Sequence, residues 1–243
     1  MGRLRNMLVA VTGVATLTLL AGSAVSYYEE SLPSTMNPLF ARTMVDKRTH
    51  ELVFDRMFYR SAITNELKSR LVAKYERLEG GKKLKLYLKE GIKWHDGKPL
   101  TGADVCFTID AMLNPKTPSP IAKGYREAIE GCEVADAGKE AAAIVAFKKL
   151  YHNPRERLAF SVLPKHAFES TAVSPDLDFS SRPTGTGPMK GSQGRREVKF
   201  TAVENSHHGA AIEILSMAEG GDPFVQVRTL LNAGVHGLIS VAP

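Results

Sequence analysis

A strand, a turn and a helix follow one another between residues 84 and 113, and this order restricts the fold more than any other feature of the chain. Apolar residues alternate with polar or aromatic ones at its start: Leu84, Leu86 and Leu88 with Lys85, Tyr87 and Lys89. This period of two predicts a strand with one face in a core and one face in water. The lysines are more typical of a solvated strand face than of an anion site.

A turn and a helix are expected to follow this strand. Gly91 ends the strand, and His95-Asp96-Gly97 predicts a tight turn. Thr101 can then cap a helix, because Asp104 lies three residues further on, as in a capping box. The expected buried stripe of this helix is Val105, Ile109 and Met112, with Cys106 and Leu113 beside it. Asn114-Pro115 is expected to stop the helix.

Shorter signals predict further elements along the chain. These are a helix over 49–58, strands over 133–134 and 141–147, a strand around 198–202, a helix over 222–234 and a strand over 238–241. Asp136-Ala137-Gly138 predicts a hairpin between the first two strands. Residues 182–194 are rich in Gly, Pro, Ser and Thr and predict a loop or a domain crossing. The mixture indicates an α/β fold with antiparallel hairpins and strand–helix crossings.

The first 26 residues have the three-part plan of a secretory signal. Two arginines precede a mainly apolar stretch over 8–20, and small residues follow over 21–26. Cleavage is expected after Ala24 or Ser26, which would place the protein in the periplasm or outside the cell; a retained membrane anchor is the alternative. Ser23 stands where a lipoprotein would need cysteine, so no lipid anchor is expected at this site.

Charge and cysteine content limit the possible partners. The net charge is +6 over 243 residues, the basic residues are spread along the chain, and no nucleic-acid motif is present, so no nucleic-acid partner is expected. The chain has two cysteines, Cys106 and Cys132. They can pair in an oxidising compartment, or Cys106 can be an ordinary buried thiol.

No catalytic residue, cofactor or metal site is predicted. His95-Asp96 contains half of a proton relay, but no motif places a nucleophile near it, so turn chemistry is the preferred interpretation. His207-His208 could touch a metal, yet adjacent histidines on a loop without other ligands seldom form a specific site. The chain is therefore not expected to be an enzyme.

Residues 91–105 read GIKWHDGKPLTGADV, and this segment resembles the signature of the family 5 extracellular solute-binding proteins. These are the oligopeptide- and dipeptide-binding receptors of ABC importers. The family pattern is roughly W-x-D-G-x-x-L-T-A-x-D-V between a strand and a helix, and Gly102-Ala103 is a small variation of it. Four further segments resemble the family in the same order: Met36-Asn37-Pro38-Leu39, Leu163-Pro164-Lys165-His166, Pro183-Thr184-Gly185-Thr186-Gly187-Pro188 and Leu230-Leu231-Asn232-Ala233-Gly234.

The last third departs from the family pattern. Met189 stands where the family usually has an aromatic residue, and residues 205–209 lack a Tyr-Trp-like pair. Val235-His236-Gly237 stands where the family has an aspartate. Family members are also much longer and form two lobes around a cleft.

The resemblance implies an α/β fold of the periplasmic-binding-protein type II-like class, with the second lobe missing. The expected parts are a signal peptide over 1–26, a first-lobe opening segment over 27–48, an inserted small α/β domain over 49–168 and an incomplete first-lobe return segment over 169–243.

The resemblance also implies a function, namely binding of a small peptide or similar solute for delivery to the membrane permease of an ABC importer. The implied ligand-binding residues are Phe40, Arg42, Thr43, Met44, Gly185, Thr186 and Gly187. Phe40 and Met44 could instead belong to the core, the two glycines could simply permit a turn, and Arg42 could be a surface charge. The short chain leaves an alternative function: a non-binding remnant or an interaction module that retains part of the fold.

Overall fold

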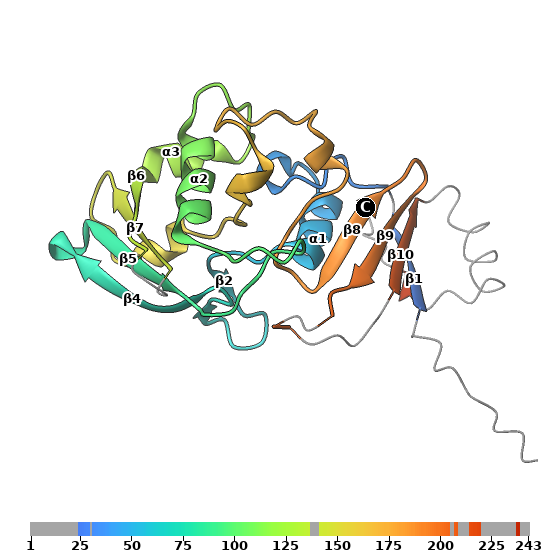
Figure 1. Cartoon of the computed structure of the whole chain (residues 1–243), viewed down its shortest axis with the longest axis horizontal. Coiled ribbons are helices and arrows are strands. Elements are labelled where there is room, and N and C mark those ends of the chain that lie inside the picture. The colour runs from blue at the N-terminus through green and yellow to red at the C-terminus, as the bar shows by residue number, and fades with distance from the viewer. Residues whose placement is uncertain are drawn as a thin grey trace, which may run out of the picture.

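The computed structural model describes residues 24–29, 31–136, 141–204, 207–208, 214–219 and 237–238. Two larger sheets lie at opposite ends of this part of the molecule, and helices lie between and above them (Figure 1). The α-helices are α1 (Met44–Val53), α2 (Gly102–Leu113) and α3 (Ala122–Ala128). Short 3-10 helices span Pro38–Phe40, Glu79–Gly81, Pro154–Arg157, Lys165–Ala167 and Asp178–Ser180.

A five-stranded sheet joins the beginning of the described chain to its end. Its strands are β1 (Ala24–Glu29), β8 (Met189–Gln193), β9 (Glu197–Ala202), β10 (Ile214–Glu219) and β11 (Gly237–Leu238), in the order β11-β1-β10-β9-β8. The first strand pairs in parallel with both β10 and β11, whereas β9 pairs antiparallel with β10 and β8. Val198 and Phe200 are fully buried, which confirms the alternation predicted for β9.

The prediction of a loop over 182–194 is wrong in its last part, because β8 occupies Met189–Gln193. Gly191 pairs there with Phe200 of β9. A Cβ atom on Gly191 would lie 2.3 Å from the Cε atom of Met36, so the glycine makes room for a core side chain. The small residues of this segment thus permit close packing inside a sheet.

A four-stranded antiparallel sheet is built from the middle of the chain. Its strands are β4 (Val72–Leu78), β5 (Lys83–Leu88), β6 (Ile129–Val134) and β7 (Ala142–Phe147), in the order β4-β5-β7-β6. The predicted hairpin is confirmed, because β6 pairs antiparallel with β7. A separate two-stranded sheet pairs β2 (Tyr59–Arg60) with β3 (Leu67–Lys68).

The predicted strand over 84–88 is confirmed, but its outer face is not fully solvated. Leu84 and Leu86 are completely buried, as the alternation requires. Tyr87, expected to face water, is only 8% exposed. The ammonium groups of Lys74 and Lys85 lie 4.2 and 4.7 Å from the centre of its ring, so two lysines cover it.

Helix α2 begins and ends where the sequence predicts, and Asp104 organises its first turn. The carboxylate of Asp104 accepts hydrogen bonds from the N–H and the hydroxyl of Thr101, at 2.9 and 3.0 Å. Its other oxygen accepts from the N–H of Lys165 at 2.8 Å. Trp94 is 2% exposed, as expected for an apolar plug, and its indole N–H points to the same carboxylate at 3.4 Å.

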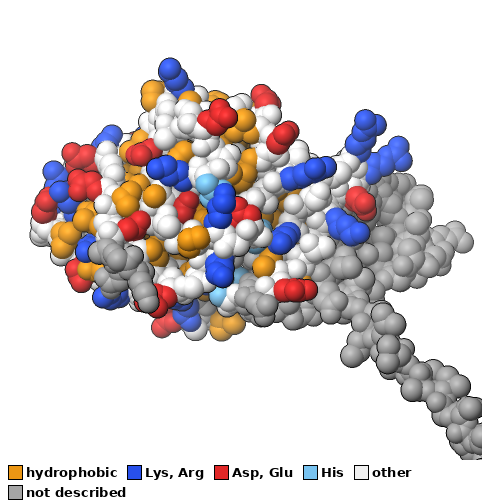
Figure 2. Space-filling model, in the orientation of Figure 1, with side chains coloured by type: hydrophobic (Ala, Val, Ile, Leu, Met, Phe, Trp, Pro, Cys, Tyr) orange, Lys and Arg blue, Asp and Glu red, His pale blue; other side chains and the backbone are white. Residues whose placement is uncertain are grey.

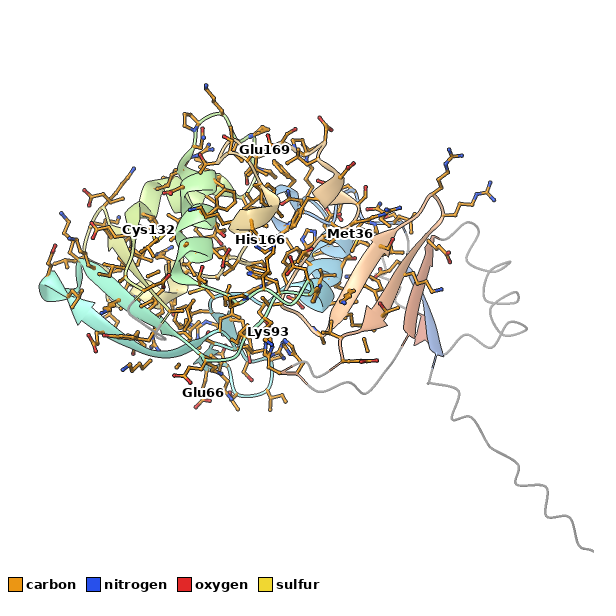
Figure 3. The ribbon with its side chains drawn as sticks, viewed as in Figure 1. Met36, Glu66, Lys93, Cys132, His166 and Glu169 are labelled. Atoms are coloured by element: carbon orange, nitrogen blue, oxygen red, sulfur yellow. A yellow bond between two sulfur atoms is a disulfide. The ribbon has the colours of Figure 1, made fainter. Side chains whose placement is uncertain are left out.

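The two cysteines form a disulfide that ties α2 to the four-stranded sheet. Cys106 in α2 and Cys132 in β6 are bonded, which decides between the two possibilities that the sequence left open. Cys132 lies on the side of the molecule that carries this sheet (Figure 3). The disulfide closes a loop that contains the rest of α2, all of α3 and the first part of β6.

The helix predicted over 49–58 is wrong in its boundaries, because α1 spans Met44–Val53. Thr43 is its N-cap: the hydroxyl accepts from the N–H of Asp46 at 3.0 Å, and the Asp46 carboxylate accepts from the N–H of Thr43 at 2.9 Å. Phe54 already has extended backbone angles. Met57 is buried from a non-helical segment, so its spacing imitated a helical face.

Several predictions fall outside the described residues. These are the first 23 residues of the signal peptide, the whole of the helix over 222–234 and strand residues 239–241. Leu238, predicted to begin a strand, does lie in β11. No helix among the residues that the structure places is both long and apolar enough to cross a bilayer.

Candidate functional site

The glycine-rich loop over 183–188 is held against the C-terminal end of α1. The N–H of Gly187 donates to the carbonyl oxygen of Val53 at 2.8 Å. A Cβ atom on Gly185 would lie 1.8 Å from this carbonyl oxygen, which no side chain can tolerate. The loop can therefore approach the end of the helix only because these positions are glycines.

His95 fixes the other side of this loop through three hydrogen bonds. Its backbone N–H donates to the carbonyl oxygen of Gly185 at 2.9 Å, and its Nδ1 accepts from the N–H of Gly185 at 3.2 Å. Its Nε2 lies 3.0 Å from the carbonyl oxygen of Gly187 and therefore carries the proton. Burial lowers the pKa of His95, although the Gly187 carbonyl partly opposes this, so the ring is held neutral.

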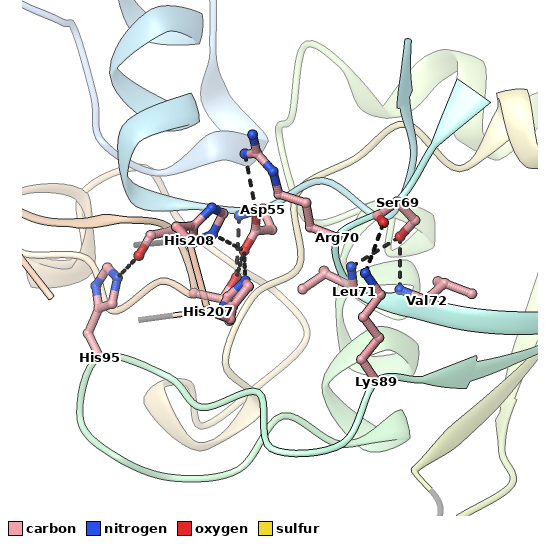
Figure 4. Close-up of polar contacts among 11 residues, drawn as sticks. Asp55, Ser69, Arg70, Leu71, Val72, Lys89, His95, His207 and His208 are labelled. Carbon is pink, nitrogen blue, oxygen red and sulfur yellow. Dashed lines mark hydrogen bonds and ion pairs between the residues drawn. The ribbon is translucent and has the colours of Figure 1, made fainter. Parts of the chain in front are cut away.

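Asp55 lies next to the loop and forms polar contacts with residues from distant parts of the chain (Figure 4). The hydroxyl of Thr186 donates to its Oδ2 at 3.1 Å, and the Nε2 atoms of His207 and His208 each lie 3.0 Å from the same oxygen. The Nη1 atom of Arg70 lies 3.8 Å from Oδ1.

Asp55 is a buried charge held by its neighbours. Its side chain is 2% exposed. Burial raises the pKa of the carboxyl, but hydrogen bonds from His207 and His208 outweigh this and lower it to about 2. The group is therefore an anion at any physiological pH.

A cavity of about 580 Å³ opens beside the loop and the cluster. It is lined by Gly91, Lys93, Trp94, His95, Gly97, Thr186, Gly187, Lys190, Thr201, Ala202, Val203, Glu204 and His207. Lys93 lies in the middle of the molecule, between the two larger sheets (Figure 3). Basic side chains (lysine or arginine) and histidines lie near one another on the visible face in this region (Figure 2). The cavity thus carries exposed charges of both signs, from Lys93, Lys190 and Glu204. Backbone atoms and the aromatic ring of Trp94 form other parts of its wall.

The structure separates the ligand-binding residues predicted from the sequence into two groups. Thr186 and Gly187 line the cavity, and Gly185 holds His95 at its wall. Arg42, Thr43 and Met44 are exposed at the N-terminal end of α1, whereas the loop contacts its C-terminal end. A ten-residue helix is about 15 Å long, so the two groups do not meet.

Phe40 has a different place again. It lies in the short 3-10 helix before α1, is 3% exposed and belongs to the hydrophobic core. The core interpretation that the sequence left open therefore describes its position. Its predicted contact with a ligand remains a prediction, as do those of Arg42, Thr43 and Met44.

Asp55, which completes a cluster with the histidine pair, was not predicted from the sequence. Asp55, His207 and His208 each place a possible metal-ligating atom within 4.8 Å of the others. Adjacent histidines alone gave a weak signal, and Asp55 lies 152 residues before His207, so no local spacing connects them. This set is the one combination of possible ligands that stands out among the described residues.

Comparison with known proteins establishes the class of this chain. Residues 66–213 match the family described as bacterial extracellular solute-binding proteins, family 5 Middle. The chain belongs to this family, and its fold is accordingly of the type II-like periplasmic-binding-protein class with mixed α/β content. The resemblance inferred from the motif around Trp94 is confirmed.

Particular relatives match most of this chain but less than half of their own length. The dipeptide-binding protein of Escherichia coli K12 is 26% identical over 243 residues, covering 91% of this chain and 44% of the relative. Protein XP55 of Streptomyces lividans is 25% identical over 214 residues, covering 86% and 38%. The structure of NikZ from Campylobacter jejuni in complex with Ni(L-His) superposes with a TM-score of 0.75 at 25% identity, covering 90% and 43%.

Proposed function

We propose that this chain forms part of an extracytoplasmic receptor that binds a small peptide or a similar solute and delivers it to the membrane permease of an ABC importer. The observation that carries the proposal is the cavity between the family signature segment around Trp94 and the loop at Thr186-Gly187. Both segments belong to the region that matches the family of solute-binding proteins.

The size and charges of the cavity support a small zwitterionic ligand. Its volume of about 580 Å³ falls within the range of small-molecule sites, roughly 300 to 1,000 Å³. Lys93 and Lys190 can attract a carboxylate, and Glu204 can attract an ammonium group. A short peptide carries one group of each kind at its two ends.

The names of the relatives support the same class of ligand. The Escherichia coli relative is a dipeptide-binding protein, and a relative from Brucella ovis, 34% identical over 102 residues, is a putative ABC transporter peptide-binding protein. By extension we assign a peptide-like solute to this chain and a permease as its partner. In this proposal the chain performs no chemistry on its ligand.

The disulfide supports a location outside the cytoplasm. Disulfides such as Cys106–Cys132 persist in oxidising compartments and are rare in the cytosol. This agrees with the signal peptide predicted over residues 1–26. We therefore propose that the protein is exported by this signal and works in the periplasm or outside the cell.

A melting experiment on the purified chain tests the proposed binding. A library of di- and tripeptides is screened for compounds that raise the melting temperature, since a ligand at 100 times its dissociation constant stabilises by about 2.7 kcal/mol. Lys190→Met removes a cation from the cavity wall and should reduce the shift produced by each positive peptide. Lys199→Met is the matched control, because Lys199 is exposed on the neighbouring strand and does not line the cavity.

Two results would count against the proposal. If no peptide shifts the melting of a cooperatively folded chain, solute binding is excluded for this chain and the interaction-module interpretation replaces it. If Lys190→Met and Lys199→Met respond equally to every positive peptide, the ligand does not occupy this cavity.

A further inference from the structure

Three side chains that the solute proposal does not use converge at the edge of the cavity. Oδ2 of Asp55 lies 3.0 Å from Nε2 of His207 and 3.0 Å from Nε2 of His208. All three possible ligand atoms lie within 4.8 Å of one another. Two atoms that bind one ion at ~2.1 Å in adjacent positions are themselves separated by roughly 3 Å. Oδ2 of Asp55 already stands at about this separation from each of the two imidazole nitrogens (Figure 4).

We propose that Asp55, His207 and His208 bind one divalent transition-metal ion. Two imidazole nitrogens with one carboxylate oxygen suit Zn²⁺, Ni²⁺, Cu²⁺ or Co²⁺, whereas Ca²⁺ and Mg²⁺ prefer sites made of oxygen atoms alone. The three residues come from the segment after α1 and from the loop before β10, so the ion would tie two distant parts of the chain together.

The surroundings of Asp55 position its carboxylate for this role. The hydroxyl of Thr186 donates to Oδ2 at 3.1 Å and accepts from the N–H of Asp55 at 3.3 Å, which fixes the orientation of the side chain. Hydrogen bonds of this kind orient metal-binding carboxylates and strengthen the site. Nη1 of Arg70 lies 3.8 Å from Oδ1, the other oxygen of Asp55. Oδ2, which faces the two histidines, is therefore the oxygen that would bind the ion.

The site is accessible from the cavity. His207 lines the cavity and keeps 28% of its side chain exposed, whereas the side chains of His208 and Asp55 are 7% and 2% exposed. An ion can therefore enter from the His207 side and remain largely enclosed. Its other coordination positions would face the cavity, where water or a small chelating ligand can occupy them.

Without a metal, the same geometry has a simpler explanation. Each imidazole can donate an Nε2–H to the carboxylate, which compensates the buried negative charge of Asp55. The two explanations differ in one measurable respect: only a metal site gives binding of one ion per chain that requires both histidines. The proposal does not depend on solute binding, because the ion alone is the probe.

The test titrates Co²⁺ into the chelator-treated full chain without any peptide and follows visible absorption. Competition with Zn²⁺ then gives the affinity for that ion, which is itself spectroscopically silent. One equivalent of Co²⁺ should produce ligand-field bands. His207→Gln and His208→Gln should each weaken binding by tenfold or more, since even the loss of a supporting hydrogen bond typically costs about 10- to 100-fold. His152→Gln is the matched control, because His152 is exposed and contributes no atom to the cluster.

Folding is monitored by circular dichroism for each variant. If His208→Gln fails to fold, His207→Gln alone decides the result. His207 is the more exposed of the two histidines, so its replacement disturbs the packing less. The proposal is overturned if the folded wild-type chain binds no stoichiometric ion, or if His207→Gln binds Co²⁺ as tightly as His152→Gln. Binding that persists in the double variant of His207 and His208 would also overturn it, because the ion would then lie elsewhere.

Discussion

Thr186 and Asp55 are 131 residues apart in the chain, yet the hydroxyl of Thr186 lies 3.1 Å from the carboxylate of Asp55. The same hydroxyl accepts from the backbone N–H of Asp55 at 3.3 Å. This reciprocal contact joins the glycine-rich loop to the segment that leaves α1. The loop that forms one wall of the cavity is thus anchored by a buried charge.

Replacing Thr186 by valine should remove this anchor while keeping the shape of the side chain. A hydrogen bond to a charged group contributes about 1.5 to 3 kcal/mol, so urea unfolding should show a loss of that order in Thr186→Val. Thr201→Val is the control, because Thr201 lies exposed on β9 and its replacement should change stability by less than about 0.5 kcal/mol. Equal stability of the two variants would show that the contact contributes nothing.

Gly185 should not tolerate even alanine. Its Cβ would meet the backbone of Val53 at 1.8 Å, and backbone atoms cannot move aside as the end of a flexible side chain can. Overpacking of this kind costs about 1 to 3 kcal/mol or more, so Gly185→Ala should lower the melting temperature clearly. Gly124→Ala in α3 meets no atom within 4 Å and should be neutral or slightly stabilising, as expected for glycine in a helix. A stable Gly185→Ala variant would mean that the loop does not sit on Val53.

Breaking the disulfide should destabilise the fold. Cys106 and Cys132 close a loop with a sequence separation of 26, for which chain entropy predicts a contribution of about 3.5 kcal/mol. Urea unfolding of the wild type with and without reductant measures this effect. The double variant Cys106→Ala and Cys132→Ala should match the reduced protein and show no response to reductant. Identical unfolding of the oxidised and reduced wild type would contradict the prediction.

Acid should destabilise the protein through His50 before the carboxylates titrate. Burial lowers the pKa of His50 to about 4 from the model-peptide value of 6.5; the carbonyl of Thr35 and the charge of Asp46 oppose this, and Arg56 adds to it. Because the folded-state pKa is depressed, the unfolded chain takes up the proton first. The stabilising contribution is complete above pH 6.5 and is lost as the pH falls towards 4. The shift corresponds to about 3 kcal/mol over this window.

The measurement is the free energy of unfolding between pH 7 and pH 4.5. His50→Asn should flatten the slope in this range, whereas His152→Asn, which changes an exposed ring, should leave the slope as in the wild type. An unchanged slope in His50→Asn would assign the acid sensitivity to another group. Asp55 cannot account for it, because its pKa lies near 2 and it titrates below this range.

Some helices and strands whose ends and buried faces depend on residues close in sequence were predicted correctly. The alternation around Leu86 and the helix start at Thr101 are of this kind, and both are confirmed. The start of α1 was missed although Thr43 and Asp46 form a capping box, because Met57 lies at helical spacing and shifted the expected helix to 49–58. Tyr87 was placed in water because the lysine that covers it from β4, Lys74, belongs to another strand.

The site was only partly predictable for the same reason. Thr186 and Gly187 were found through the family resemblance, and both line the cavity. Asp55 reaches His208 across 153 residues, and only the fold brings them together. A pair of adjacent histidines has no periodicity that points to a distant carboxylate, so this part of the site required the structure.

The position of β1 inside its sheet has a consequence for the order in which the protein can be built. Its partners span Ile214–Glu219 and Gly237–Leu238, whereas every strand of the four-stranded sheet lies within residues 72–147. During folding, the middle sheet can therefore close while β1 still has no partner. Because the loop-closure entropy of nearly the whole chain opposes the pairing of β1, completion of the five-stranded sheet should be the slow, late event. A chain that ends before residue 214 would contain every strand of the four-stranded sheet, while β1 would have neither of its partner strands.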